Sequence, residues 1–134
     1  MISFTIPGVP IPQPRPSVTR TGRVFYKANG CREWRQAIAL TASRLFPVPD
    51  DGPWKIQAVY IFERPPSHYT KSGKLTRAAK AIQIPPRPDV DNLNKALNDA
   101  LEGVIYNNDS QIGWQEAGKV YGDKARTEVT IRRF

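Results

Sequence analysis

The sequence has little of the side-chain chemistry on which many protein classes depend. It contains one cysteine, Cys31, and one histidine, His68, among 134 residues. Cys31 has no second thiol for an internal disulfide, so we expect a reducing compartment. A Cys/His zinc site is excluded, and so is a nuclease mechanism that requires two histidines. His68 lies in a polar stretch, and we expect it to be a solvated bystander.

Two further absences bear on the cellular location of the protein and on its catalytic nucleophile. The N-terminus has no charged-then-apolar leader, and no apolar run is long enough to span a bilayer. We therefore expect a cytoplasmic protein that does not bind a membrane. No Gly-x-Ser-x-Gly segment is present, which argues against a serine nucleophile of the hydrolase type.

Acidic residues are outnumbered by basic ones. Lys and Arg total 20 and Asp and Glu total 12, so the formal net charge is +8. A small protein with this balance most often has a polyanionic partner, usually nucleic acid, although a basic solvated surface gives the same count. The basic residues form an early and a late group, and we expect both to contact DNA phosphates. The early group is Arg15, Arg20, Arg23, Lys27, Arg32 and Arg35, and the late group is Lys71, Lys74, Arg77, Lys80 and Arg87.

Hydrophobic periodicity predicts one α+β domain over residues 1–134, with a mixed sheet and two main helices. Alternating segments predict strands within 2–7, 54–64, 114–122 and 125–134, and the second should be central because it is apolar on both faces. The stretch "RVFYK" fits a short hairpin strand, and "TRAAKA" fits a short helix. Phe25 and Tyr26, in the first of these, fit equally well the closing of a hairpin and stacking on exposed bases.

Two segments carry helical spacing. The first runs from Cys31 to Phe46, before Pro47. Its apolar stripe consists of Trp34, Ile38, Ala42 and Leu45. The second begins near Asp91 or Asn92, both good N-cap residues, and Gly103 stands where a C-terminal cap belongs. Its apolar face consists of Leu93, Leu97, Ala100, Leu101 and Val104.

The stretch "RPDVDNLNK", residues 87–95, places two carboxylates close together in this basic chain. The prolines before Asp89 favour an extended backbone. Residues i and i+2 of an extended chain point to the same side, so Asp89 and Asp91 are expected to face one point. Two carboxylates so placed repel each other, and a bound divalent cation removes the conflict. Mg²⁺ suits this pair, because it prefers oxygen ligands and is often held by one or two carboxylates.

A third carboxylate and a lysine complete a candidate hydrolytic site. Asp109 follows a predicted helix of about 18 Å. It can approach Asp91 only if the chain returns antiparallel, for which the apolar residues 104–106 are candidates. Lys95 lies one helical turn after Asp91, opposite the leucine stripe. There it can orient a water or neutralise charge on a phosphate, so the set fits metal-assisted phosphodiester hydrolysis.

Each component also has a simpler interpretation. Asp91 alone fits a helix N-cap. Lys95 and Asp91 together fit a surface ion pair worth about 0.3–0.5 kcal/mol. Asp109 alone fits a turn. The combination favours a metal site, because D-x-D-N-x-x-K at a helix start, a further aspartate beyond the helix and a basic chain occur together.

Residues 87–112, "RPDVDNLNKALNDALEGVIYNNDSQI", resemble the RusA-type Holliday junction resolvases, which are often encoded by phages or prophages. The matching positions are Asp89, Asp91, Asn92, Leu93, Lys95, Ala96, Asp99, Gly103, Asp109 and Gln111. The resemblance implies a homodimeric endonuclease of a bacterial or phage-infected cell that makes paired nicks in four-way DNA junctions. It implies Mg²⁺, for which Mn²⁺ can substitute, held by Asp89, Asp91 and Asp109, with Lys95 as an essential lysine.

The resemblance also implies roles beside the metal ligands. The family often has two adjacent acids where this chain has Asn108 and Asp109, and Asn108 supplies an amide oxygen without charge. Asn92 is expected beside the ligands, and Asp99 either orients Lys95 or is a helix-surface acid. The expected function is Mg²⁺-dependent, structure-selective cleavage of branched DNA in recombination and repair. The alternatives are a general Mg²⁺-dependent nuclease and a non-catalytic DNA-binding protein.

Overall fold

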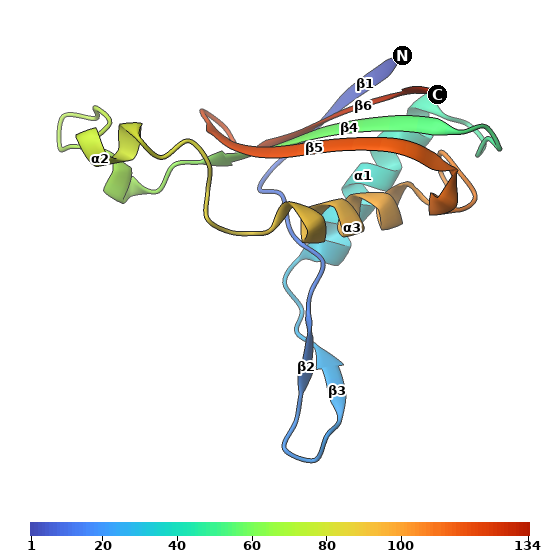
Figure 1. Cartoon of the computed structure of the whole chain (residues 1–134), viewed down its shortest axis with the longest axis horizontal. Coiled ribbons are helices and arrows are strands. Elements are labelled where there is room, and N and C mark those ends of the chain that lie inside the picture. The colour runs from blue at the N-terminus through green and yellow to red at the C-terminus, as the bar shows by residue number, and fades with distance from the viewer.

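A four-stranded mixed sheet in the order β1-β6-β4-β5 forms the centre of the molecule (Figure 1). The computed structural model describes residues 1–134. The strands are β1 (Ile2–Pro7), β4 (Trp54–Glu63), β5 (Ile112–Gly122) and β6 (Arg126–Arg133). β4 runs parallel to β5 and antiparallel to β6, and β1 runs antiparallel to β6. The predicted α+β class and mixed sheet are confirmed.

β4 is an interior strand, as its composition predicts. Ile56, Ala58 and Tyr60 alternate toward the core and are almost fully buried. Ile61 points to the opposite face and is also buried, at 5% exposure. The inner face of β4 is covered by the helices, and its outer face is buried only near the end of the strand, since Gln57 is exposed.

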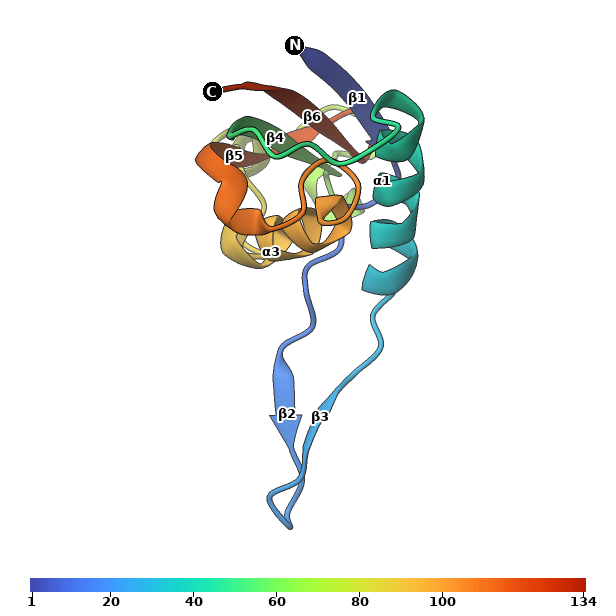
Figure 2. The same ribbon diagram turned by 90° about the vertical axis from the view of Figure 1, so that its right-hand side faces the viewer.

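Helices α1 (Cys31–Leu45) and α3 (Val90–Leu101) cover one face of the sheet (Figure 2). Their apolar faces join the same buried cluster as the inner side chains of the sheet. The stripe predicted for α1 is confirmed except at Leu45, which is 43% exposed. Phe46 packs there instead, with its ring centroid 5.9 Å from that of Trp54.

Helix α3 begins slightly earlier than predicted, at Val90. Asp89 is the N-cap residue, and both Asp91 and Asn92 already lie in the helix. Gly103 follows the helix with φ +80°, a conformation that glycine adopts without strain. This part of the prediction is confirmed.

The remaining elements project from the body. Strands β2 (Pro16–Val18) and β3 (Val24–Tyr26) pair as a hairpin that extends away from the helices (Figure 1). A separate lobe contains the 3-10 helix η1 (Pro66–His68) and the short helix α2 (Arg77–Lys80), so the predicted hairpin strand and short helix are confirmed. No helix is long and apolar enough to cross a membrane.

The interpretation of His68 as a solvated bystander is wrong. The side chain is half-buried, and its ring packs edge-on against Tyr121 with a centroid separation of 5.4 Å. Its Nδ1 lies 3.3 Å from Nη1 of Arg64, whose guanidinium stacks on the same tyrosine. His68 therefore helps to attach the lobe to the end of β5.

Candidate functional site

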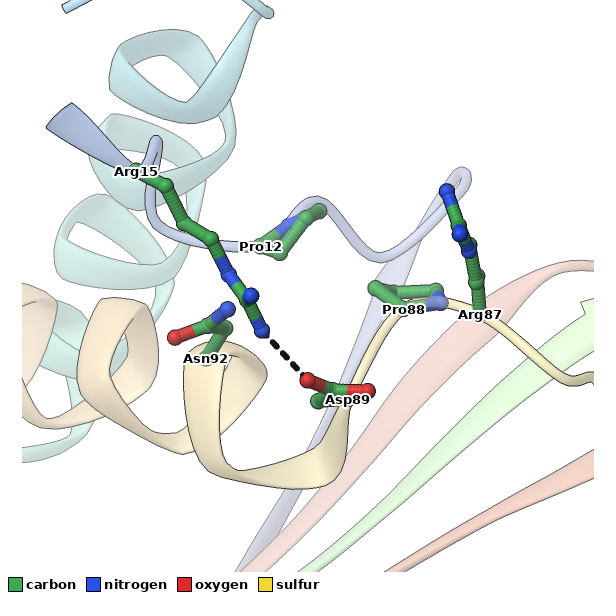
Figure 3. A pocket seen from close by; sticks show the side chains of 6 residues that line it. All are labelled: Pro12, Arg15, Arg87, Pro88, Asp89 and Asn92. Atoms are coloured by element: carbon green, nitrogen blue, oxygen red, sulfur yellow. Dashed lines mark hydrogen bonds and ion pairs between the residues drawn. The ribbon is translucent and has the colours of Figure 1, made fainter. Parts of the chain in front are cut away.

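The start of α3 presents Asp89 to solvent. Asp89 has extended backbone angles, φ −70° and ψ 140°, and its side chain makes no capping hydrogen bond. The carboxylate instead accepts a hydrogen bond of 2.5 Å from Nη2 of Arg15, which approaches from the base of the hairpin (Figure 3). An N-cap aspartate usually bonds the first amides of its own helix. The carboxylate of Asp89 is therefore turned to a residue far away in the sequence.

Asp91 and Lys95 lie on the exposed face of the first helical turns. Nζ of Lys95 is 3.4 Å from Oδ2 of Asp91, and their side chains are 61% and 79% exposed. Leu93 and Leu97 are fully buried, which confirms that Lys95 lies off the apolar stripe. The extended-chain argument for the acid pair is wrong, because Asp91 belongs to the helix. What remains is two exposed carboxylates at one helix end.

Two residues expected beside the site have other partners. Asp99 does not contact Lys95 but lies 3.7 Å from Nη1 of Arg35 on α1, where the two helices pack. Asn92, with its amide oxygen turned to the guanidinium of Arg15, accepts hydrogen bonds of 2.9 and 3.1 Å. Asp99 therefore joins the helices, whereas Asn92 shares a partner with Asp89.

Asp109 lies beyond the opposite end of α3. It begins the 3-10 helix η2 (Asp109–Gln111), directly before β5, and it is exposed. The expected antiparallel return of residues 104–106 is wrong, because these residues form a tight turn in which Ile105 N–H bonds to Leu101 C=O at 3.0 Å. The 12-residue helix spans about 18 Å. No group of three metal-binding side chains comes together within this chain.

Asn108 has a local structural role. Its side-chain oxygen accepts from Ser110 N–H at 2.9 Å, and the Gln111 side chain accepts from Asn108 N–H at 3.1 Å. The amide of Gln111 also donates to the carbonyls of Asp50 and Gly52 at 2.6 and 3.1 Å. This reciprocal cap fixes the turn that presents Asp109.

Lys119 contributes to the site and was not anticipated from the sequence. Its Nζ donates to the carbonyl of Pro88 at 3.0 Å and lies 3.4 Å from that of Pro86. It projects from β5 on the side that faces α3, where Gln115 bonds to Asn98. The sequence does contain a signal for Lys119, because a charged residue there occupies a position of the strand that faces the helices. Lys119 holds the segment that leads directly into Asp89.

An open cavity of about 630 Å³ lies between this segment and the base of the hairpin. Its lining residues are Pro12, Arg15, Arg87, Pro88, Asp89 and Asn92. Figure 3 shows Arg15 and Arg87 on different sides of Asp89. The cavity brings together a carboxylate and two guanidinium groups, which suits a phosphate-bearing ligand next to a cation.

Most of the basic residues expected to contact DNA are exposed on the two projections, but Arg32 and Arg35 lie on α1, where Arg35 is half-buried beside Asp99. Arg20, Arg23 and Lys27 lie on the hairpin segment. Lys71, Lys74, Arg77 and Lys80 lie on the lobe. The start of α3 lies between the two projections in Figure 1. This arrangement can place cations on both sides of a bound nucleic acid.

Comparison with known proteins points to one family. The family model described as endodeoxyribonuclease RusA matches residues 7–132. The "Uncharacterized protein YqaN" of Bacillus subtilis (strain 168) is 34% identical over 135 residues, covering 98% of this chain and 95% of that protein. The "Crossover junction endodeoxyribonuclease rusA" of Lactococcus phage r1t is 50% identical over 46 residues, covering 34% of this chain and 35% of the phage protein.

Proposed function

Because the chain belongs to the RusA endodeoxyribonuclease family, we propose that it resolves four-way (Holliday) DNA junctions by Mg²⁺-dependent hydrolysis during recombination and repair. The observation that carries this proposal is the exposed set of Asp89, Asp91 and Lys95 at the start of α3, in a chain of net charge +8. The carboxylates suit a divalent cation as ligands. The positive charge of the rest of the protein suits a polyanionic substrate.

The donor set at the start of α3 fits Mg²⁺. Mg²⁺ is commonly held by one or two carboxylates together with several waters, and Asp89 and Asp91 are both exposed enough to leave room for water. When bound, the ion supplies a polarised phosphoryl oxygen and a more acidic water. Mn²⁺ has the same preference for oxygen ligands and can substitute.

The chain's own groups perform the remaining tasks. Lys95, next to Asp91, orients the attacking water or neutralises charge on the scissile phosphate. Lys119 fixes the segment before Asp89. The basic residues of the hairpin and lobe hold the DNA backbone, so binding weakens steeply as salt rises.

Asp109 can complete such a site only from a second copy of the chain. It lies beyond the far end of a helix about 18 Å long, so it cannot join Asp89 and Asp91 of its own chain. A two-fold homodimer that places η2 of one copy against the start of α3 of the other supplies Asp109 of the partner subunit to each site. Two symmetric sites also match the two strands that a junction resolvase must nick.

The proposal is tested by nicking of a synthetic four-way junction and of linear duplex with the same sequence, in Mg²⁺. We expect wild type to cut the junction in preference to the duplex. Asp91→Asn should cut at least about a hundredfold more slowly and still bind, because the basic projections carry the affinity. Glu116→Gln, an exposed acid on the outer face of β5, is the control and should cut normally.

Each alternative predicts a different result. Equal cutting of junction and duplex identifies a general nuclease. Salt-dependent binding with no cleavage identifies a DNA-binding protein without catalytic activity. If wild type and Asp91→Asn cut equally well, the assignment of Asp91 is wrong.

A further inference from the structure

The base of the hairpin is joined to both helices. We call residues 12–29 the arm. Gln13 N–H donates to Asn92 C=O of α3 at 3.0 Å, and Gln13 Oε1 accepts from Arg35 Nη1 of α1 at 3.3 Å. Asn29 Nδ2 closes the base by donating to Pro12 C=O at 2.9 Å. Hydrogen bonds therefore link the position of the arm to the first turn of α3.

One side chain of the arm reaches the acid pair itself. Arg15 donates to Oδ2 of Asp89 at 2.5 Å and approaches the Asn92 side chain at 2.9 and 3.1 Å. Figure 3 shows the guanidinium extended across the cavity toward Asp89. A guanidinium and a divalent cation repel each other, and they compete for the same carboxylate oxygen. Arg15 thus lowers the availability of Asp89 for a metal ion.

We propose that Arg15 couples DNA binding to metal binding: it covers Asp89 until a DNA phosphate takes over its guanidinium and releases the carboxylate to the cation. This inference rests on the proposed function. It changes the role of Arg15 from a simple phosphate contact to a residue that positions Asp89 and responds to DNA. Arg15 remains a binding residue in both states, but with a different partner in each.

The exposure of the pair suits such an exchange. The side chains of Arg15 and Asp89 are 71% and 58% exposed. An exposed ion pair is weak, because water and salt screen it. A phosphate can accept two parallel hydrogen bonds from one guanidinium and competes well for it. The pair is therefore stable enough to hold Asp89 and weak enough to be exchanged.

The coupling must be reciprocal. If DNA raises the affinity for the metal ion by some factor, the metal ion raises the affinity for DNA by the same factor. Removing Arg15 should improve metal binding without DNA and reduce the gain that DNA provides. A residue that only supports the fold would not produce this pair of opposite changes.

The test measures Mn²⁺ affinity of the full chain without DNA, by electron paramagnetic resonance of free Mn²⁺. Arg15→Gln should bind Mn²⁺ about three- to fivefold more tightly than wild type. Arg15→Lys, which retains the charge, should stay near wild type. Arg44→Gln removes the same charge from the exposed far end of α1 and should leave the affinity unchanged. Junction affinity with and without Ca²⁺ measures the reciprocal effect, which should be smaller in Arg15→Gln.

The proposal is overturned if Arg15→Gln binds Mn²⁺ no more tightly than wild type, or if Arg44→Gln tightens binding equally. Thermal melting of Arg15→Gln shows whether the variant is folded. If it is not, Arg15→Met, which also removes the charge and keeps a long side chain, is measured in its place and should tighten Mn²⁺ binding by a similar factor. Failure of the proposed function is a separate result, namely no cleavage of a junction by wild type in Mg²⁺. Tighter Mn²⁺ binding by Arg15→Gln in a protein that does not cleave would retain the coupling and reject the nuclease.

Discussion

The two ends of α3 differ in charge and in how they are held. At its start, the acid pair is surrounded by cations: Arg15 contacts Asp89, Lys95 contacts Asp91, and Lys119 binds the segment before them. At its end, hydrogen bonds fix the turn that carries Asp109. They form within η2 and between Gln111 and the carbonyls of Asp50 and Gly52.

Two pKa values describe the surroundings of the far end, where acids lie near Tyr106 and hydrogen-bond donors keep Asp50 ionised. Burial raises the pKa of the Tyr106 phenol, and the negative charges of Asp109 and Glu102 raise it further. The backbone N–H of Gly52 and the guanidinium of Arg133 hold the pKa of the Asp50 carboxyl below its ordinary value. The start of α3 is thus suited to receive an anion and a cation, whereas its end presents fixed negative charge. We propose that the cations at the start of α3 attract the acids at its end in the two-fold dimer proposed above.

The largest effect is expected from mixing two inactive variants. Under the proposed function, Asp91→Asn and Asp109→Asn should each inactivate every site of their own homodimer. In a mixed dimer, one site contains both substitutions and the other contains neither, if the two ends of α3 meet between subunits. Subunit exchange should therefore restore about a quarter of wild-type nicking.

The measurement is nicking of a four-way junction after co-refolding of the two variants, with each variant alone as the control. Restored activity should appear as nicks in one strand, since each mixed dimer has one intact site. Absence of any restored activity, with mixed dimers present, would reject the shared site.

A smaller effect is expected at the segment before Asp89. Lys119→Met removes the charged donor from the carbonyls of Pro88 and Pro86, so Asp89 should be less well positioned. We expect cleavage to slow about ten- to a hundredfold, with little change in junction affinity. Single-turnover cleavage and a binding assay separate the two quantities.

One control variant keeps the positive charge at position 119, and the other removes a lysine at a different position. Lys119→Arg should recover part of the rate, whereas Lys124→Met, at the exposed turn between β5 and β6, should cut normally. If Lys119→Met weakens junction binding as strongly as it slows cleavage, Lys119 is a DNA contact and not a positioning residue.

The smallest effect is expected at the far end of α3. Asn108→Asp adds a carboxylate next to Asp109 and can still accept the Ser110 N–H, because aspartate is a good N-cap. We expect the Mg²⁺ concentration for half-maximal cleavage to fall about two- to fivefold with unchanged thermal stability.

Asn107→Asp provides the contrast for this variant. The Asn107 side chain donates to Asp51 at 2.8 Å, so an aspartate there would place like charges together. It should lower the melting temperature without lowering the Mg²⁺ requirement. The same Mg²⁺ response in both variants would mean that added charge, and not its position beside Asp109, is responsible.

Local sequence patterns determined much of the fold. The spacing of apolar residues identified α1 and α3. A period near 3.6 residues can be recognised from the residues of adjacent helical turns alone. The acid pair and Lys95 were likewise found within nine residues, 87–95. Their positions relative to the leucine stripe follow from helix geometry alone. The boundary of α3 was less accurate, since Asp89, Asp91 and Asn92 are all acceptable caps.

The tertiary structure alone decided which distant groups meet. Arg15 and Asp89 are separated by 74 positions, and no local period connects them. Asp99 forms an ion pair with Arg35 and not with Lys95 because α1 packs beside it. Asp109 is near Asp91 in sequence but lies at the opposite end of a helix, because the tight turn at 103–106 leads into η2 and then β5 and does not return along the helix. Sequence spacing fixes the direction of side chains within an element, whereas the packing of elements fixes the contacts between them.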